Sequence, residues 1–397
     1  MFKVIHTADF HIDNQNIDEA QKCLEFIIKR TKIEQPDIVM IAGDLFDSRN
    51  VKLESPAAML LFDIITQMAN FTPVAIVYGT PSHEGDATAA LRYLKAKHPI
   101  HVSDKPEQYY MMNDNSFVSN PGGKQPKLVI SAIPQPTKQY LKSSSSIDVA
   151  NQEIASTMSN IFAGFGATAA RYKTPHILMG HFSVSGAAIN DKRQMVGLDI
   201  EISNDQIALT SADLVALGHI HLRQKVGNNG FYSGSIFPTD WGELEDKGFY
   251  IHTLENKKLI ESNFIKTPSR KLIKISEDLT KDCDIDYLLS ADSIPEIKDA
   301  NLKIELKVYQ DEAQKIDKEE IKKALINMGA KSVGVHLLRM PRENVRSKNI
   351  LKLTTLQEKV IEWAKLRGET VSESILKKAD LLEFEDADKI IQGVASA

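Results

Sequence analysis

The sequence has 397 residues, of which 42% are apolar and 25% are charged, with a formal net charge of −5 and only two cysteines, Cys23 and Cys283. This composition is typical of a globular protein with room for more than one domain, and it argues against a protein that coats nucleic acid by bulk positive charge. No apolar run reaches the about 20 residues of a membrane helix and the start lacks a secretory pattern, so we expect a cytoplasmic protein that crosses no membrane.

The first part of the chain, residues 1–265, alternates apolar runs with helical patterns, which predicts an α/β domain. The spacing of apolar residues predicts helices at 17–33, 56–69 and 86–96. The apolar runs that we interpret as strands lie at 2–5, 38–42, 74–78, 128–133, 176–179 and 214–217.

A change in composition near Thr267 indicates a second, smaller domain at residues 266–345. Within it, residues 302–308 alternate apolar and charged side chains, which is typical of a half-buried strand. A helix is predicted to begin after Asp317 and to end at Gly329, and another alternating strand follows. These elements predict a compact β-α-β unit.

The end of the chain, residues 346–397, is predicted to form a linker and two short amphipathic helices. Thr354 with Gln357, and Thr370 with Glu373, have the spacing of capping boxes. The apolar faces of such helices must be covered, either by the rest of the same chain or by a partner. The sequence leaves both alternatives open.

Several predicted strands are followed by residues of metal-ligand type. In open α/β sheets, ligand sites lie at the carboxyl ends of the strands, so these side chains are expected to meet. Asp-x-His or a single His is weak evidence by itself, whereas Gly-His-x-His is stronger because one intervening residue in extended backbone sends both rings to one side. The motifs are Asp9-Phe-His11, Gly43-Asp44-Leu-Phe-Asp47, Gly79-Thr-Pro-Ser-His83-Glu84, Gly180-His181 and Gly218-His219-Ile-His221.

The residue types in these motifs indicate the chemistry. Carboxylate oxygen together with imidazole nitrogen suits a borderline divalent ion such as Mn²⁺, Fe²⁺ or Zn²⁺ better than an all-oxygen Mg²⁺ site. A shared aspartate could bridge two ions about 3.5–4 Å apart, and such a pair binds and polarises a phosphate and lowers the pKa of water. We therefore predict a two-metal phosphoesterase.

The order of these motifs resembles that of the calcineurin-like metallophosphoesterases, and within them the SbcD-type, or meiotic-recombination-eleven, nucleases. Residues 42–47 are similar to the second motif of these nucleases, and the stretches at 234–236, 241–243 and 247–249 are similar to the part that follows their last metal motif. The resemblance implies a four-layer α/β/β/α sandwich at residues 1–265, a small α/β capping domain, and a C-terminal helical tail that binds an ATPase.

The resemblance also implies a role for each site residue. Asp9, His11, Asp44 and His221 would hold one ion. Asp44 would bridge to a second ion that is held by His181 and His219. His83 would stabilise the phosphate and act as a general acid, and Asp47 would orient a ligand.

One motif departs from the family pattern, which is usually Gly-Asn-His followed by an acid, with Asn as a ligand. Here two extra residues precede His83, and Ser82 stands in the Asn place. A serine hydroxyl is shorter and a weaker neutral donor than a carboxamide. Ser82 is a ligand if its longer loop brings it close; otherwise the second ion binds weakly or with an extra water.

The function implied by the resemblance is Mn²⁺-dependent exonuclease and endonuclease cleavage of DNA, with two Mn²⁺ ions per subunit. The working unit would be a homodimer bound to an SMC-like ATPase of the SbcC type, in double-strand-break repair or recombination. Two alternatives are another metallophosphoesterase with a small substrate, either a phosphodiesterase or a phosphatase, and a catalytically weak scaffold with the same fold.

Overall fold

The computed structural model describes residues 1–137, 147–190, 193–194, 200–281, 297–341 and 350–384. The chain divides into two compact units, of which the first contains Met1–Ile275, Leu289–Ile304 and Glu320–Val335. The second contains Ser276–Leu288, Glu305–Glu319 and His336–Ala397. All candidate site residues lie in the first unit, so its layers decide how the site is built.

One sheet of the first unit has six strands in the order β17-β16-β1-β2-β3-β4. Strands β1 to β4 run parallel to one another, whereas β16 pairs antiparallel with β1. The carboxyl ends of β1, β2 and β3 therefore meet at one edge. The strands are β1 (Phe2–Thr7), β2 (Ile38–Ala42), β3 (Val74–Val77), β4 (Ile100–Ser103), β16 (Gly248–Glu255) and β17 (Lys258–Lys266).

The other sheet has seven strands in the order β14-β15-β13-β8-β7-β5-β6. Strands β7, β8, β13 and β15 are parallel, so the ends of β8 and β13 also share an edge. The strands are β5 (Glu107–Met111), β6 (Phe117–Val118), β7 (Leu128–Ile133), β8 (His176–His181), β13 (Leu214–Gly218), β14 (Gln224–Val226) and β15 (Gly230–Tyr232).

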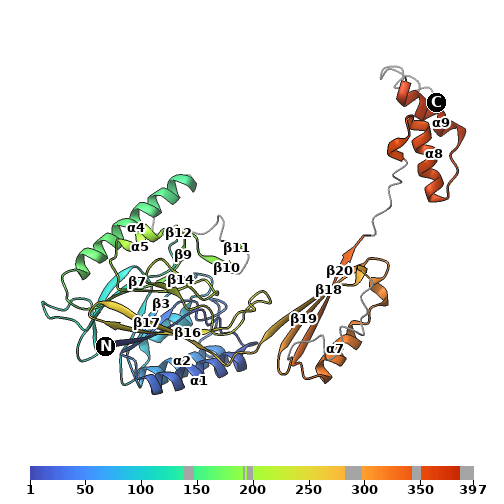
Figure 1. The fold of residues 1–397 in the computed structure, drawn as a ribbon. Coiled ribbons are helices and arrows are strands. Elements are labelled where there is room, and N and C mark those ends of the chain that lie inside the picture. Colours follow the sequence, from blue (N-terminus) through green and yellow to red (C-terminus); the bar gives the residue numbers. More distant parts are fainter. Residues whose placement is uncertain (138–146, 191–192, 195–199, 282–296, 342–349, 385–397) are drawn as a thin grey trace. The chain divides into compact units, whose positions relative to one another are not determined.

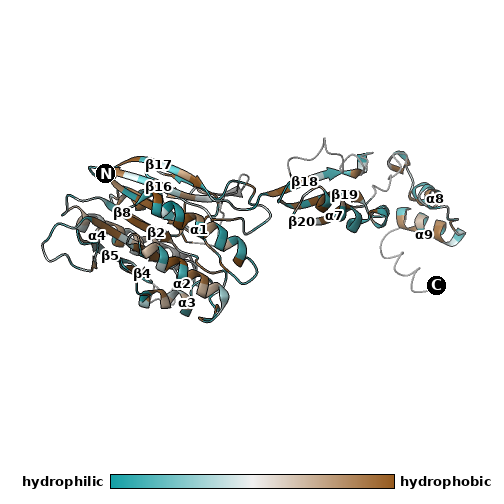
Figure 2. Cartoon of the chain, turned by 90° about the horizontal axis from the view of Figure 1, so that it is seen from below, coloured by the Kyte–Doolittle hydropathy of each residue, from teal (hydrophilic) through white to brown (hydrophobic). Residues whose placement is uncertain are grey.

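The two sheets pack face to face over an apolar core that includes Val4 and Met40 from one sheet and Met179 and Ala216 from the other. Helices α1 (Ile17–Glu34), α2 (Pro56–Ala69) and α3 (Asp86–Ala90) cover the outer face of the six-stranded sheet. Helices α4 (Ile147–Ala169) and α5 (Asn204–Ala208) cover the other sheet. Figures 1 and 2 show these layers, with apolar strands inside and mixed helices outside. The predicted four-layer α/β/β/α sandwich is confirmed.

Local signals in the sequence fix the ends of the outer helices. Ser55 accepts a hydrogen bond from the Ala58 N–H and Pro56 stands in the first turn, which together start α2. In α1, Ala20, Leu24 and Ile27 form a fully buried stripe. The predicted strands correspond to β1, β2, β3, β7, β8 and β13.

Three predictions about helices need correction. The helix expected at residues 86–96 ends at Ala90 and continues only as a 3-10 turn (Leu91–Tyr93), because the chain becomes extended at Leu94. The capping box of α8 (Leu356–Arg367) pairs Thr355 with Glu358 and is therefore one residue later than expected. The second predicted box also fails, since Glu373 is already the first residue of α9 (Glu373–Phe384).

The small sheet contains β18 (Leu272–Asp278), β19 (Asn301–Tyr309) and β20 (Ser332–Met340), in that order. Helix α7 (Lys318–Asn327) lies between β19 and β20 along the chain, so the predicted β-α-β unit is present and has one more strand. Asp317 accepts the Glu319 N–H at the start of α7. The domain boundaries expected at residues 265 and 345 stay a prediction.

Candidate metal centre

The loops after β1, β2 and β13 carry predicted ligands in an unusual backbone conformation, whereas His181 is the last residue of β8. Asp9, His11, Asp44 and His219 have positive φ angles of 54°, 43°, 52° and 93°. Such angles cost free energy for residues other than glycine, and they persist where the surrounding structure imposes them. Here the Asp9 N–H donates to the Gly43 carbonyl, 3.0 Å away, and the His11 N–H donates to the Asp44 carbonyl, 3.1 Å away. The two loops therefore hold each other.

Asp9, His11 and His221 form a first cluster, in which the potential ligand atoms all lie within 4.8 Å of one another. The Nε2 atoms of His11 and His221 are 2.9 Å apart. Asp9 Oδ2 is buried and has no hydrogen-bond partner among the described residues. A buried carboxylate oxygen without a partner is costly, and a cation would compensate it. This arrangement fits a divalent ion.

Asp44, His181 and His219 form a second cluster of the same kind. His181 Nδ1 lies 2.7 Å from the Ala42 carbonyl oxygen and donates to it. Its Nε2 faces Asp44 Oδ2 at 3.2 Å, and the same oxygen is 3.8 Å from His11 Nε2. Asp44 Oδ2 therefore lies between the two clusters, where a bridging ligand is required.

The pKa shifts of Asp44 and His181 indicate that a positive charge is favourable between the two side chains. Burial alone would raise the pKa of Asp44, but the neighbouring His181 and His11 hold it well below its usual range. Burial alone would lower the pKa of His181, but the charge of Asp44 and the hydrogen bond to it raise that pKa to about 9. Without a metal, a proton on His181 supplies the positive charge, and a divalent ion could replace it.

The structure does not bring Ser82, the expected neutral ligand, to the second cluster. Ser82 is exposed, and its carbonyl oxygen accepts the Arg49 N–H. The neighbour of the second cluster is Thr80, whose hydroxyl lies 3.0 Å from Asp44 Oδ2 and 3.4 Å from His181 Nε2. This geometry makes Thr80 the nearer candidate for the neutral ligand, with the two extra residues of the motif after it, and its role stays a prediction.

Glu84 holds the two loops that carry Asp44 and Thr80. Its Oε1 accepts the N–H groups of Asp44 and Gly79, both at 2.9 Å, and its Oε2 accepts the Thr88 hydroxyl. Burial and the charge of Asp44 raise the pKa of Glu84. A Cβ at position 79 would collide with the Asp44 side chain and its backbone nitrogen, so only glycine fits there.

His83 and Asp47 lie beside the first cluster. His83 Nδ1 donates to the Asp47 carbonyl oxygen at 2.8 Å, and its ring meets the His11 ring edge-on, with centroids 4.8 Å apart. Asp47 Oδ1 is 3.6 Å from His11 Nδ1. This geometry is compatible with a general acid and an orienting carboxylate, and both roles stay predictions.

Glu243 is a further site residue to which the sequence assigned no role. Its Oε1 lies 2.6 Å from His221 Nδ1. Burial alone would raise the pKa of Glu243, but the hydrogen bond from His221 and the charge of Lys247 hold it well below its usual range. A carboxylate only accepts, so His221 Nδ1 carries the proton and its Nε2 is left with the lone pair that a metal ligand needs.

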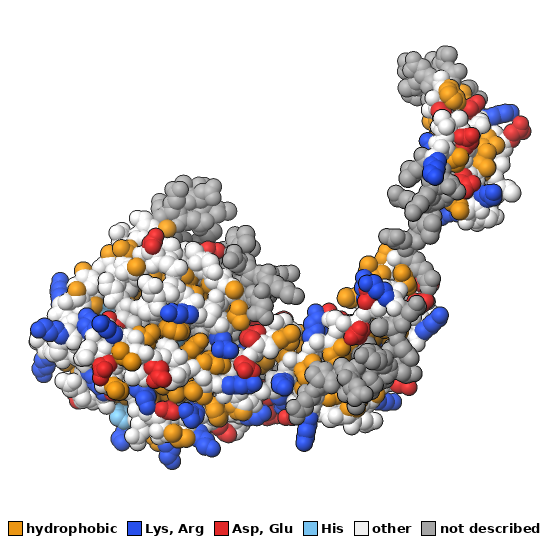
Figure 3. Space-filling view, in the orientation of Figure 1, with side chains coloured by type: hydrophobic (Ala, Val, Ile, Leu, Met, Phe, Trp, Pro, Cys, Tyr) orange, Lys and Arg blue, Asp and Glu red, His pale blue; other side chains and the backbone are white. Residues whose placement is uncertain are grey.

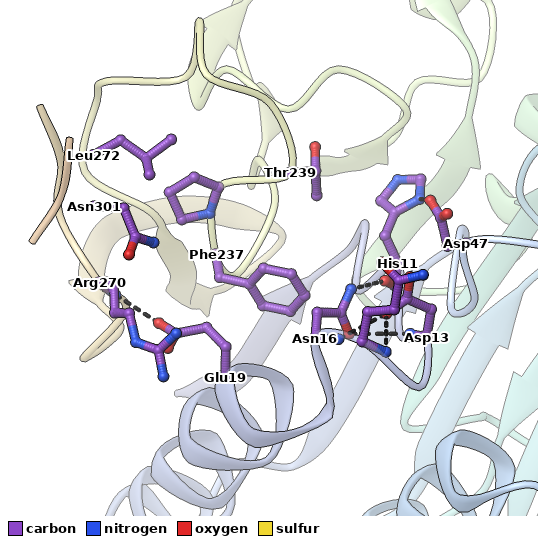
Figure 4. A pocket seen from close by; sticks show the side chains of 12 residues that line it. His11, Asp13, Asn16, Glu19, Asp47, Phe237, Thr239, Arg270, Leu272 and Asn301 are labelled. Carbon is purple, nitrogen blue, oxygen red and sulfur yellow. Dashed lines mark hydrogen bonds and ion pairs between the residues drawn. The ribbon is translucent and has the colours of Figure 1, made fainter. Parts of the chain in front are cut away.

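A cavity of about 280 Å³ opens beside His11 and Asp47. Figure 4 shows the ring of Phe237 and the side chains of Asn16 and Thr239 around it, with Arg270 paired to Glu19 at 3.1 Å on the far side. The cavity is therefore continuous with the first cluster and could take a group attached to a phosphate there.

Comparison with known proteins gives a family match and several curated relatives. The model of the calcineurin-like phosphoesterase family matches residues 2–223. A Staphylococcus epidermidis protein that is named as a subunit of the nuclease SbcCD is 24% identical over 291 residues, which cover 70% of this chain and 72% of the relative. The protein of the same name from Staphylococcus saprophyticus is 23% identical over 278 residues, covering 68% and 70%.

Solved structures are similar at a lower level. GAP50, the anchor in the inner membrane complex of Plasmodium, has a TM-score of 0.43 at 13% identity and covers 67% of this chain and 85% of its own. A dimetal phosphatase from Danio rerio has a TM-score of 0.40 at 11% identity and covers 67% and 99%. These scores carry no argument about function.

Proposed function

Since the chain belongs to the calcineurin-like phosphoesterases, we propose that it is a Mn²⁺-dependent nuclease that hydrolyses phosphodiester bonds in DNA. The observation that carries this proposal is the position of Asp44 Oδ2 between two clusters of histidine and carboxylate side chains. Mixed nitrogen and oxygen ligands favour Mn²⁺ over Mg²⁺. Two such ions suit the cleavage of a phosphate ester.

Bound metal ions and protein side chains would each contribute to the reaction. Bound divalent ions would polarise the phosphodiester and lower the pKa of the attacking water. Asp44 stays anionic at neutral pH because His181 and His11 surround it. His83 donates Nδ1 to the Asp47 carbonyl oxygen, and its ring is partly exposed. In the doubly protonated ring, Nε2 would donate a proton to the leaving oxygen.

Two features favour DNA over a small phosphate ester. The chain carries the small sheet with α7 and the helices α8 and α9 in addition to the sandwich, and a small-substrate enzyme has no need of them. The face of the first unit drawn in Figure 3 mixes basic and acidic side chains. Bound metal ions would supply positive charge at the site itself. The cavity beside His11 would take a nucleotide next to the reacting phosphate.

Exposed apolar side chains on α8 and α9 support a protein partner. A docked partner would cover them, and an SMC-like ATPase of the SbcC type is the partner that the names of the relatives suggest. We also propose a homodimer as the working unit. No helix in the described parts of the chain is long and apolar enough to cross a membrane. The exposed large apolar residues of these helices are Ile361, Trp363, Leu366, Ile375, Leu381, Leu382 and Phe384, which are 45–69% exposed.

Comparing two substrates tests the proposal. Purified protein with Mn²⁺ should degrade linear duplex DNA much faster, per mole of phosphodiester at equal concentration, than it turns over bis-nitrophenyl phosphate. The reverse preference would favour a small-substrate phosphodiesterase. Protein that binds no metal and cleaves neither substrate would favour a scaffold with the same fold.

A further inference from the structure

Lys247 is a buried cation next to the metal centre. The residue is only 2% exposed and directly precedes β16. Its ammonium group lies 2.8 Å from Glu243 Oε2, 2.5 Å from Glu245 Oε1 and 3.1 Å from the His221 carbonyl oxygen. An ammonium group has three protons, so each of them has an acceptor. A buried charge is tolerated only with such partners, which makes this arrangement specific.

Lys247 therefore reaches His221 by two routes. The direct route is the hydrogen bond to the His221 carbonyl oxygen, which fixes the main chain. The indirect route passes through Glu243, whose second oxygen accepts from the His221 ring at Nδ1. The main chain and the ring of the same candidate ligand are thus held from one ammonium group.

The Glu243 carboxylate also fixes a residue that lines the cavity. Thr239 donates its backbone N–H to Glu243 Oε2 at 3.0 Å and its hydroxyl to Oε1 at 2.9 Å. Thr239 lines the cavity beside His11, as Figure 4 shows. Glu243 therefore connects the first cluster to the space where a substrate group would lie.

We propose that Lys247 and Glu243 are positioning residues that fix the ring of His221, and thereby give the site of Asp9, His11 and His221 its affinity for a metal ion. This inference rests on the proposed function, because it takes the cluster to be a metal site. In the second cluster, Asp44 is held by Glu84 and His181 by the Ala42 carbonyl oxygen. Substituting Lys247 or Glu243 should therefore weaken the binding of one ion and leave the binding of the other unchanged.

Binding of Mn²⁺ to the full-length chain tests this inference without any activity measurement. In the Lys247→Met and Glu243→Gln variants, calorimetric titration should show that the affinity for one ion falls about 10- to 100-fold and that the affinity for the other is unchanged. This is the usual effect of removing a residue that hydrogen-bonds to a metal ligand. Lys266→Met is the matched control, because Lys266 pairs with Asp246 on the surface, where both side chains are about half exposed. That variant should bind both ions as the wild type does.

Circular dichroism of the metal-free variants shows whether they fold. Lys247→Met leaves two acids without their cation, so Glu243→Gln, which keeps the shape of the side chain, decides the test if the lysine variant unfolds. Folded Glu243→Gln protein that binds both ions with wild-type affinity would overturn the inference and leave the proposed function standing. Wild-type protein that binds no ion would overturn both.

Discussion

Asp44 and His181 face each other in the interior, with Oδ2 of the carboxylate 3.2 Å from Nε2 of the ring. They come from different sheets, since Asp44 follows β2 and His181 ends β8. Because His181 already donates Nδ1 to a carbonyl oxygen, the pair needs a positive charge on its other side. The sandwich thus brings the ends of two sheets together at a place that favours a cation.

Asp9→Asn should stabilise the metal-free fold and at the same time weaken the binding of Mn²⁺. Asp9 Oδ2 is buried and has no hydrogen-bond partner among the described residues, and the substitution gives an uncharged amide that keeps the oxygen that accepts the His219 N–H. The metal-free variant should melt at a higher temperature than the metal-free wild type. A Mn²⁺ concentration of 100 times the dissociation constant of the wild type stabilises that protein by about 2.7 kcal/mol. The same concentration should stabilise the variant much less. Equal stabilisation of both proteins by Mn²⁺ would argue against Asp9 as a ligand.

Thr80→Asn should tighten the ion at the second cluster. A carboxamide oxygen is a better neutral ligand than a hydroxyl and extends further from the same backbone position. Calorimetry should show the weaker Mn²⁺ ion bound more tightly in Thr80→Asn and less tightly in Thr80→Ala. Ser82→Ala is the control and should change neither ion, because Ser82 is exposed. A loss of affinity in Ser82→Ala would show that Ser82, and not Thr80, is the neutral ligand.

His83→Gln should abolish DNA cleavage and leave metal binding intact. The variant removes the proton donor, and general acid catalysis typically contributes about 10²- to 10⁴-fold to the rate. Cleavage rate and Mn²⁺ stoichiometry are measured on the same sample. A variant that has lost an ion would show that His83 is a ligand.

The buried pair of His6 and His252 should make the stability of the protein sensitive to acid. His6 lies 3.1 Å from the Leu217 carbonyl oxygen and 3.3 Å from His252, and burial lowers the pKa of His6 to about 4 although the Leu217 carbonyl opposes that shift. The neutral ring gives its full stabilisation above pH 6.5. As the pH falls toward 4, the unfolded chain takes up a proton that the folded chain does not, and about 3 kcal/mol of stability is lost.

Urea unfolding of the metal-free protein at pH 7 and pH 5 measures this effect. The wild type should be less stable at pH 5, and His6→Asn should show a smaller difference between the two conditions. An identical pH dependence in the variant would show that His6 is not the group responsible.

The fold and most of the candidate site could be predicted because their signals are local. Strands such as β2 are buried on both faces and therefore form continuous apolar runs in the sequence. Asp9 and Asp44 follow neighbouring parallel strands of one sheet, whose carboxyl ends share an edge, and His181 ends a strand of the other sheet. The strand ends therefore indicated the candidate ligands, whereas the meeting of the two groups depends on how the two sheets pack.

The remaining features depend on contacts that spacing does not encode. The motif at residues 79–84 has two more residues than the family pattern, but only the loop geometry places Thr80, and not Ser82, beside Asp44 and His181. Glu243 and Lys247 lie 22 and 26 positions after His221, and they meet it only because the chain folds back after β15. Helix α4 was not predicted, although Met158, Ile161, Phe162 and Phe165 recur at helical spacing and pack on the core of the second sheet.

Electron paramagnetic resonance of the protein loaded with two equivalents of Mn²⁺ tests the metal centre most directly. A carboxylate shared between the clusters predicts a spin-coupled pair in the wild type and the loss of that coupling in Asp44→Asn. Two magnetically isolated ions in the wild type, or no bound ion at all, would contradict the two-metal account.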